Sequence, residues 1–196
     1  MGKCSRPPNE VILTSILGGL LLENRVPAGS IVTAGAQMGR WACFWAAVGG
    51  ERRVWALDPD PGHIAAIRQT YTPDVYPTLW PMHGALGASE RNISGFSRAG
   101  RAGLSLYPAT SANASRSPFK IFTLDRLFER EALGFIHLDV EGHELEALTG
   151  GLAVLQRDVT TSRLKTSLRL AAALPHMPRR LRPPGPRLGV QRPLAC

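Results

Sequence analysis

The sequence predicts an α/β fold built on a doubly wound, mostly parallel sheet. Short apolar runs that are typical of buried strands alternate with segments whose apolar residues recur at helical spacing. Glycine, proline and aspartate mark the junctions between these segments. Strands that alternate with helices favour a parallel sheet covered by helices, in which ligands bind beyond the carboxyl ends of the strands.

The first quarter of the chain predicts a helix, a strand and a second helix. Residues 11–22 form its most apolar run and predict a buried helix. Twelve residues are too few to cross a bilayer, so we expect no transmembrane segment. Residues 30–34 predict a short buried strand. The spacing of apolar side chains from Met38 to Val48 then predicts a helix, which Gly49 ends.

Two further strands and a helix follow. Residues 53–57 predict the second strand. Asp60 is a favourable N-cap and Pro61 suits the first helical position, so the next helix is expected to begin here and to extend to Tyr71. Residues 79–83 predict the third strand.

After the third strand, the sequence predicts a loop or hairpin insertion at residues 88–118, a strand at 119–122 and a short helix at 124–130. A strand at residues 134–139 and a longer helix at 142–155 are predicted to follow. We expect one hairpin near Leu104 within the insertion, and Thr123 as the cap of the short helix. One face of the last helix is expected to be apolar and to pack on the sheet. Its members are Leu145, Leu148, Leu152 and Leu155.

The net charge of +8 belongs to the end of the chain. Residues 1–158 hold 15 basic and 15 acidic residues, whereas residues 159–196 hold the other 8 basic residues and no acid. We therefore expect one domain over residues 1–158 and a disordered, proline- and arginine-rich tail over residues 159–196, which binds polyanions weakly. No disulfide framework can be read from three widely spaced cysteines, and we expect a reducing, cytoplasmic location.

A glycine turn and an acid mark the first two strand ends. Gly35 and Gly39 flank a turn where the backbone can approach a ligand closely, although many ordinary turns also need glycine. Asp58 ends the second strand and can accept hydrogen bonds from both hydroxyls of a ribose. The spacing Gly35-x-x-x-Gly39, with Gln37 inside it, differs from the G-x-G-x-x-G of nicotinamide dinucleotide sites. This spacing therefore favours S-adenosylmethionine over a dinucleotide, because S-adenosylmethionine has no phosphates.

Acidic residues also follow the strand predicted at 134–139. Asp139 and Glu141 would line a pocket that attracts a sulfonium and an amino group and repels a pyrophosphate. Glu144 suits the positive end of the helix that begins here, which is a structural role. His143 is either a general base or a polar residue at a helix start. No metal-ligating constellation is evident.

Three blocks of the chain resemble the FkbM family of S-adenosylmethionine-dependent methyltransferases. They are PAGSIVTAGAQMGRWACFWA, VWALDPDPGHIAAIR and FKIFTLDRLF…FIHLDVEGHELEALTGG, and the resemblance covers about residues 20–157. It implies a class I methyltransferase, or Rossmann-like, fold with the cofactor at the carboxyl ends of the first strands. By position, the methionine end would face Gly35, Ala36, Gln37 and Gly39. Asp58 would hold the ribose, Ala85 and Leu86 would lie near the adenine, and Asp139 would border the amine and the transferred methyl.

The chain departs from this family in two ways. Thr33 stands where an acid is usual and Gln37 where an asparagine is usual. The missing acid removes a partner for the cofactor's amine or an ordering hydrogen bond, so weaker binding is expected. The full fold also continues with three further strands, whereas only 41 residues follow Leu155. We therefore expect the C-terminal strands to be missing or degenerate.

Two functions remain open from the sequence. The first is an S-adenosylmethionine-dependent methyltransferase that acts on a hydroxyl of a small molecule or sugar, with His143 or Glu141 as the base. The alternative is an inactive, truncated methyltransferase-fold remnant that binds partners through its basic tail.

Overall fold

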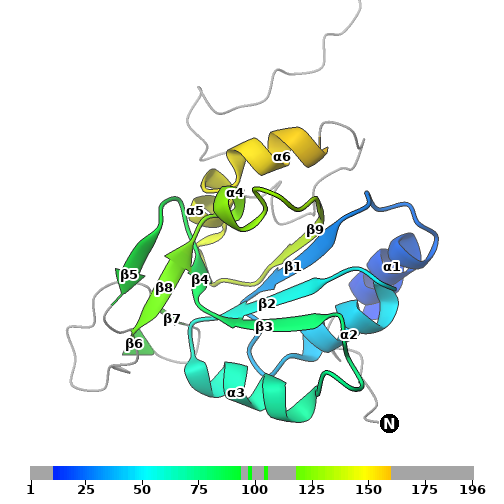
Figure 1. Cartoon of the computed structure of the whole chain (residues 1–196), viewed down its shortest axis with the longest axis horizontal. Coiled ribbons are helices and arrows are strands. Elements are labelled where there is room, and N and C mark those ends of the chain that lie inside the picture. The colour runs from blue at the N-terminus through cyan, green and yellow to red at the C-terminus, as the bar shows by residue number, and fades with distance from the viewer. Residues whose placement is uncertain (1–10, 94–96, 99–103, 106–117, 160–196) are drawn as a thin grey trace, which may run out of the picture. The chain divides into compact units, whose positions relative to one another are not determined.

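A four-stranded sheet in the order β3-β2-β1-β9 lies at the centre of the computed structural model (Figure 1). Its strands are β1 (Ser30–Ala34), β2 (Val54–Asp58), β3 (Leu79–His83) and β9 (Leu133–Leu138). All neighbouring pairs are parallel, which confirms the predicted sheet. The structure describes residues 11–93, 97–98, 104–105 and 118–159, which belong to one unit spanning residues 1–164. The tail predicted over residues 159–196 lies outside the described residues, apart from its first residue.

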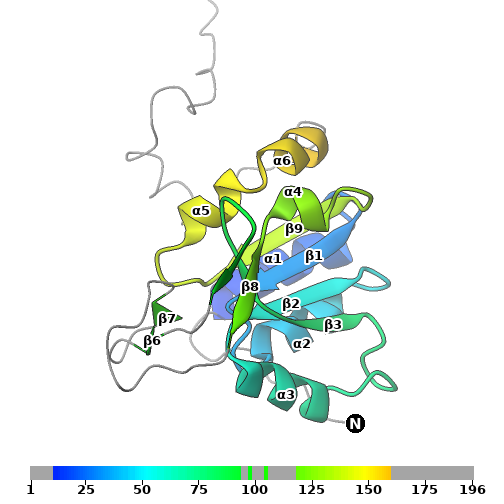
Figure 2. The same cartoon turned by 60° about the vertical axis from the view of Figure 1, so that its left-hand side comes forward.

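Helices cover both faces of this sheet, as a doubly wound fold requires (Figure 2). One face packs against α1 (Val11–Leu22), α2 (Arg40–Val48) and α3 (Pro61–Thr70). The other packs against α4 (Leu124–Leu127), α5 (Glu144–Thr149) and α6 (Leu152–Val159). β1 is buried along its whole length because it lies inside both layers. None of the described helices is long and apolar enough to span a bilayer.

Side chains of β9 alternate between the two layers. Phe135 packs against the cluster formed with α1, α2 and α3, and its ring lies 4.9 Å from that of Trp45. Ile136 and Leu138 pack against the opposite cluster. This is the two-residue period of an extended strand. The directions of the side chains from Phe135 to Leu138 were therefore readable from the sequence, whereas Leu133, which precedes a shift in register, packs against the same cluster as Ile136.

The starts of the first helices show which local predictions hold. Asp60 accepts a hydrogen bond from the Gly62 N–H (2.8 Å), and Pro61 is the first residue of α3, as predicted. α2, however, begins at Arg40, and Met38 lies in the turn before it with 55% of its surface exposed. The prediction that Met38 belongs to the buried face of this helix was wrong, because the turn around Gly39 (φ 80°) delays the first helical residue.

β3 forms despite its central proline. Pro81 pairs in register with Ala56, and β3 is an outer strand of the four-stranded sheet. Outer strands tolerate proline because one of their edges needs no N–H donor. The Pro81 carbonyl accepts a hydrogen bond from the Arg68 side chain (3.2 Å), so this part of the strand is tied to α3.

The single helix predicted at residues 142–155 was wrong: the chain forms α5 and α6 with a break at Gly150 and Gly151. The Asp125 carboxylate accepts from the N–H groups of Ala153 (3.3 Å) and Val154 (2.8 Å), so it starts a new helix there. The break changes which side chains face the core. Ala147 and Val154 are buried, whereas Leu152 is 42% exposed. The predicted leucine face, with Leu145, Leu148 and Leu155, therefore does not exist as one stripe.

The region between β3 and β9 contributes a second, smaller sheet. Its strands lie in the order β4-β8-β5. They are β4 (Ala85–Leu86), β8 (Phe119–Phe122) and β5 (Arg91–Ile93). β6 (Ser97–Arg98) pairs antiparallel with β7 (Leu104–Ser105), where the sequence predicts a hairpin. The strand predicted at 119–122 is thus present, in this sheet and not in the main one.

The state of Cys43 could not be predicted from the sequence. It is buried in α2 and is disulfide-bonded. The other two cysteines, Cys4 and Cys196, lie outside the described residues. The sequence revealed no disulfide framework, because three widely spaced cysteines give no spacing from which a pairing can be read.

Candidate active site

The glycine turn after β1 lies directly against the end of β9. The Asp139 N–H donates to the Ala34 carbonyl (3.0 Å), which continues the strand pairing by one residue. Gly35 has φ 77°, and a Cβ atom at this position would collide with the Asp139 carbonyl group. Only glycine permits this contact. The structure thus brings together the two segments that the resemblance to the FkbM family would place at the methionine end of the cofactor.

Both turns at this edge hold a non-glycine residue in the left-handed region. Gln37 has φ 47° and Glu141 has φ 51°, and each is the third residue after its strand. Such conformations cost on the order of 1 kcal/mol or more and concentrate at functional sites. β1 and β9 are neighbouring strands of the sheet. After β1 the chain continues into α2 on one face, and after β9 it continues into α5 on the other face. The two turns therefore flank the topological switch point of the sheet.

Asp58, the last residue of β2, fastens the glycine turn to the start of α3. Its Oδ2 atom accepts from the Gln37 N–H (2.7 Å), and its Oδ1 atom accepts from the Asp60 N–H (2.9 Å). The His63 ring nitrogen Nδ1 lies 3.0 Å from the same Oδ1 atom. Only 3% of Asp58 is exposed. A carboxylate has about four acceptor positions, so about one remains for a ribose hydroxyl unless a present donor moves.

Glu141 and His143 share the short turn that follows Asp139. Glu141 is exposed, and His143 is half-buried at the N-cap position of α5. The His143 N–H donates to the Val140 carbonyl (3.2 Å), and the His143 carbonyl accepts from the Ala147 N–H (3.0 Å). The backbone of this turn is therefore held while the side chains keep some access to solvent. Within the described ranges, no group of three His, Cys, Asp or Glu residues is placed to bind a metal.

Ala85 and Leu86 lie in the first strand of the small sheet. Leu86 is buried in the core cluster with Leu57 and Val32, so its side chain is used for packing. Ala85 is half-buried and packs against the Phe119 and Ile121 cluster. Any contact with an adenine would therefore come from the backbone of this strand or from the Ala85 methyl group.

Sequence reasoning missed two histidines at this edge. His63 contacts Asp58, and the five-residue spacing from a strand end to the first turn of the next helix could have indicated it. His137 lies on β9, with its Nδ1 atom 2.9 Å from the Thr33 Oγ1 atom on β1. These two residues are 104 positions apart, so no local pattern could have paired them.

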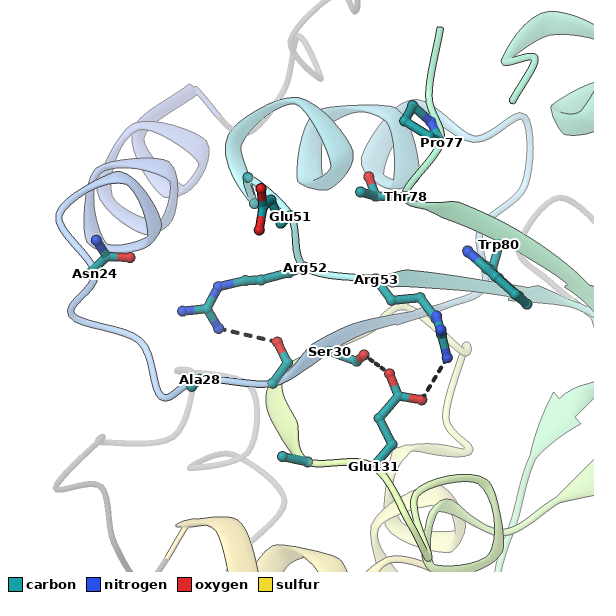
Figure 3. A pocket seen from close by; sticks show the side chains of 14 residues that line it. Asn24, Ala28, Ser30, Glu51, Arg52, Arg53, Pro77, Thr78, Trp80 and Glu131 are labelled. Atoms are coloured by element: carbon teal, nitrogen blue, oxygen red, sulfur yellow. Dashed lines mark hydrogen bonds and ion pairs between the residues drawn. The ribbon is translucent and has the colours of Figure 1, made fainter. Parts of the chain in front are cut away.

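A hollow of about 760 Å³ opens at the opposite edge, near the amino ends of the strands (Figure 3). Its polar side chains are largely engaged with each other and with the backbone. Glu131 accepts from the Ser30 hydroxyl and from Arg53 (3.1 Å), and the Arg53 guanidinium lies over the Trp80 ring. Arg52 donates to the carbonyls of three residues between β1 and α1: Val26, Pro27 and Gly29. These contacts fasten strand ends and loops, so we assign the hollow a structural role.

One comparison with known proteins gives a match. The family model described as the methyltransferase FkbM domain matches residues 33–166. The match begins inside β1 and includes both turns, Asp58 and the helices α5 and α6. No curated protein and no solved structure matches the chain.

Proposed function

The chain belongs to the FkbM methyltransferase family, and from this premise we propose that it moves a methyl group from S-adenosylmethionine to a hydroxyl of a small molecule or sugar. The observation that carries the proposal is the contact between the Gly35 turn and Asp139 at the carboxyl edge of β1 and β9. It joins a ligand-accessible backbone turn to an acid at the switch point of a parallel sheet.

The side chains at this edge suit a cationic cofactor without phosphates. Neither turn, residues 35–39 or residues 139–143, contains a lysine or arginine. Asp139 and Glu141 would attract the sulfonium and the amino group, and Asp58 would accept one ribose hydroxyl. Gly142 has no neighbour within 4 Å of its Cβ position, which leaves space beside these carboxylates. A dinucleotide would instead place its pyrophosphate against acids.

The protein's contribution to the reaction would be orientation and proton removal. S-adenosylmethionine supplies an activated methyl group on a positively charged sulfur. The turns would hold the acceptor oxygen in line with that methyl, which accounts for much of the rate in such displacements. Glu141 or His143 would remove the hydroxyl proton, because both lie within four residues of Asp139 in the same turn.

Calorimetric titration tests the cofactor class first. The purified chain is titrated with S-adenosylmethionine, S-adenosylhomocysteine and NAD, and we expect heat from the first two and none from the third. Transfer of a tritiated methyl group to a panel of sugars and small alcohols then tests the acceptor class. Binding of NAD without S-adenosylhomocysteine would overturn the proposal.

We expect Asp139→Asn to weaken S-adenosylmethionine binding by about 1–2 kcal/mol, since a charge-assisted contact to a cation is lost. The amide keeps the size of the side chain, so the fold should persist. Binding of S-adenosylhomocysteine, whose sulfur is neutral, should fall less if Asp139 acts on the sulfonium, and equally if it acts on the amine. Calorimetry with both ligands gives this difference.

Glu129→Gln is the matched control for that experiment. Glu129 is an exposed acid that pairs with Arg126 on α4 (2.6 Å), away from the crevice. The Glu129→Gln substitution removes the same formal charge as Asp139→Asn, so it reports the general effect of protein charge on ligand affinity. If both variants bind both ligands as the wild type does, Asp139 does not contact the cofactor.

Glu131→Gln tests which edge of the sheet is functional. It should lower the free energy of unfolding by about 1 kcal/mol, because the bonds to buried Ser30 and to Arg53 weaken. The affinity for S-adenosylhomocysteine should not change. Glu51→Gln is the control in the same hollow, since Glu51 forms no ion pair within the described residues. Loss of ligand affinity in Glu131→Gln alone would move the site to this edge.

A further inference from the structure

A threonine–histidine pair joins β1 and β9 one residue before the end of their paired register. Thr33 and His137 are direct partners in the parallel register of β1 and β9. Thr33 is fully buried, and its Oγ1 atom lies 2.9 Å from the His137 Nδ1 atom. Two residues further along each strand come Gly35 and Asp139, which touch through their backbones. The pair therefore sits immediately behind the two turns.

The imidazole of His137 also contacts the helix that follows the glycine turn. Its ring centre lies 4.5 Å from that of Trp41 and 5.8 Å from that of Trp45, both on α2. α2 begins at Arg40, directly after Gly39. One side chain of β9 thus reaches both β1 and α2, and these three elements carry the turns of the candidate site.

The chemistry of the pair tolerates either form of the ring. A hydroxyl can donate to an unprotonated Nδ1 atom or accept from a protonated one. The tryptophan faces can pack against a neutral imidazole and attract a charged one. The hydrogen bond therefore does not depend on a particular tautomer. An ordering bond at position 33 is thus present, although the acid expected there is absent.

We infer that Thr33 and His137 are positioning residues, which set the distance between the glycine turn and Asp139 and thereby the affinity for the cofactor. This inference rests on the proposed function. Neither residue is assigned a contact with the cofactor: Thr33 is enclosed, and His137 is covered by α2 on one side. They act through the two turns in front of them.

Four substitutions test the pair. Thr33→Val and His137→Phe remove the hydrogen bond but keep the approximate size of each side chain. Thr33→Ser and His137→Asn keep a hydrogen-bonding group at the corresponding position. Ile31→Val is the matched control, since Ile31 is buried on the same face of β1, two residues further from the turns.

Two measurements are made on each variant. Amide hydrogen exchange at Asp139, whose N–H bonds to Ala34, reports the turn without any ligand. Calorimetry with S-adenosylhomocysteine reports affinity. We expect Thr33→Val and His137→Phe each to raise both the exchange rate and the dissociation constant about tenfold. The double variant should be no worse than either single one, because the two share one interaction.

The conservative variants should restore most of the affinity, and Ile31→Val should lower stability without a selective change at Asp139. Exchange at Asp139 that is unchanged in both Thr33→Val and His137→Phe would overturn the inference. The inference would also be overturned if the exchange rate at Asp139 rose in these two variants only as much as it does in Ile31→Val. If the wild type binds no S-adenosylhomocysteine, the proposed function fails, while hydrogen exchange still decides whether the pair positions the turn.

Discussion

Gly35→Ala is expected to lower the free energy of unfolding by about 3–5 kcal/mol and to abolish cofactor binding. Two effects add at this position. Alanine is strained at φ 77°, which costs roughly 1–2 kcal/mol. Its Cβ atom would also collide with the carbonyl group of Asp139, which is backbone and cannot turn away as a side chain can. β1 and β9 would have to separate at their carboxyl ends.

Gly142→Ala separates these two effects. Gly142 also has a positive φ, of 100°, and lies in the partner turn, but no atom lies within 4 Å of its Cβ position. It should therefore cost only about 1–2 kcal/mol. Urea unfolding of both variants measures the difference. Equal losses would show that Gly35 does not lie against Asp139 as described.

Asp58→Ala should be the second largest effect, with a loss of about 3–5 kcal/mol. The substitution leaves the N–H groups of Gln37 and Asp60 and the ring of His63 without their charged acceptor at a partly buried place. Each hydrogen bond to a charged group contributes about 1.5–3 kcal/mol. Unfolding is measured without ligand, so the result does not depend on whether Asp58 also holds a ribose.

Asp60→Ala is the matched control, two residues away in the same loop. Asp60 caps α3 by accepting from the Gly62 N–H, and loss of an N-cap costs about 1 kcal/mol. A similar loss in both variants would mean that the Asp58 carboxylate does not organise the turn. Loss of activity in Asp58→Ala alone is not evidence of ribose binding, because the turn itself depends on this carboxylate.

The sequence predicted features that depend on neighbouring residues. The strand at Ser30–Ala34 and the cap at Asp60 follow from local hydrophobicity and capping chemistry. The alternation along β9 follows from strand geometry. These features placed Gly35 and Asp139 at the same edge of one sheet. Much of the framework of the candidate site was therefore predictable.

Features that depend on distant contacts were not predictable. The break between α5 and α6 is stabilised by Asp125, which lies more than 25 residues earlier. The partner of Thr33 is 104 residues away. The donors on Asp58 include a histidine and a backbone N–H from another turn. In each case the sequence shows suitable groups, and only the folded chain shows which of them meet.

The proline in β3 has a consequence for self-association. Open sheet edges invite strands from other molecules, because their N–H and C=O groups lack partners. On the outer side of β3, Pro81 has no N–H to offer, and its carbonyl already accepts from Arg68. A strand that approached this edge would find an interruption at its centre. The residue that weakens the strand pattern thereby protects this edge of the sheet against aggregation.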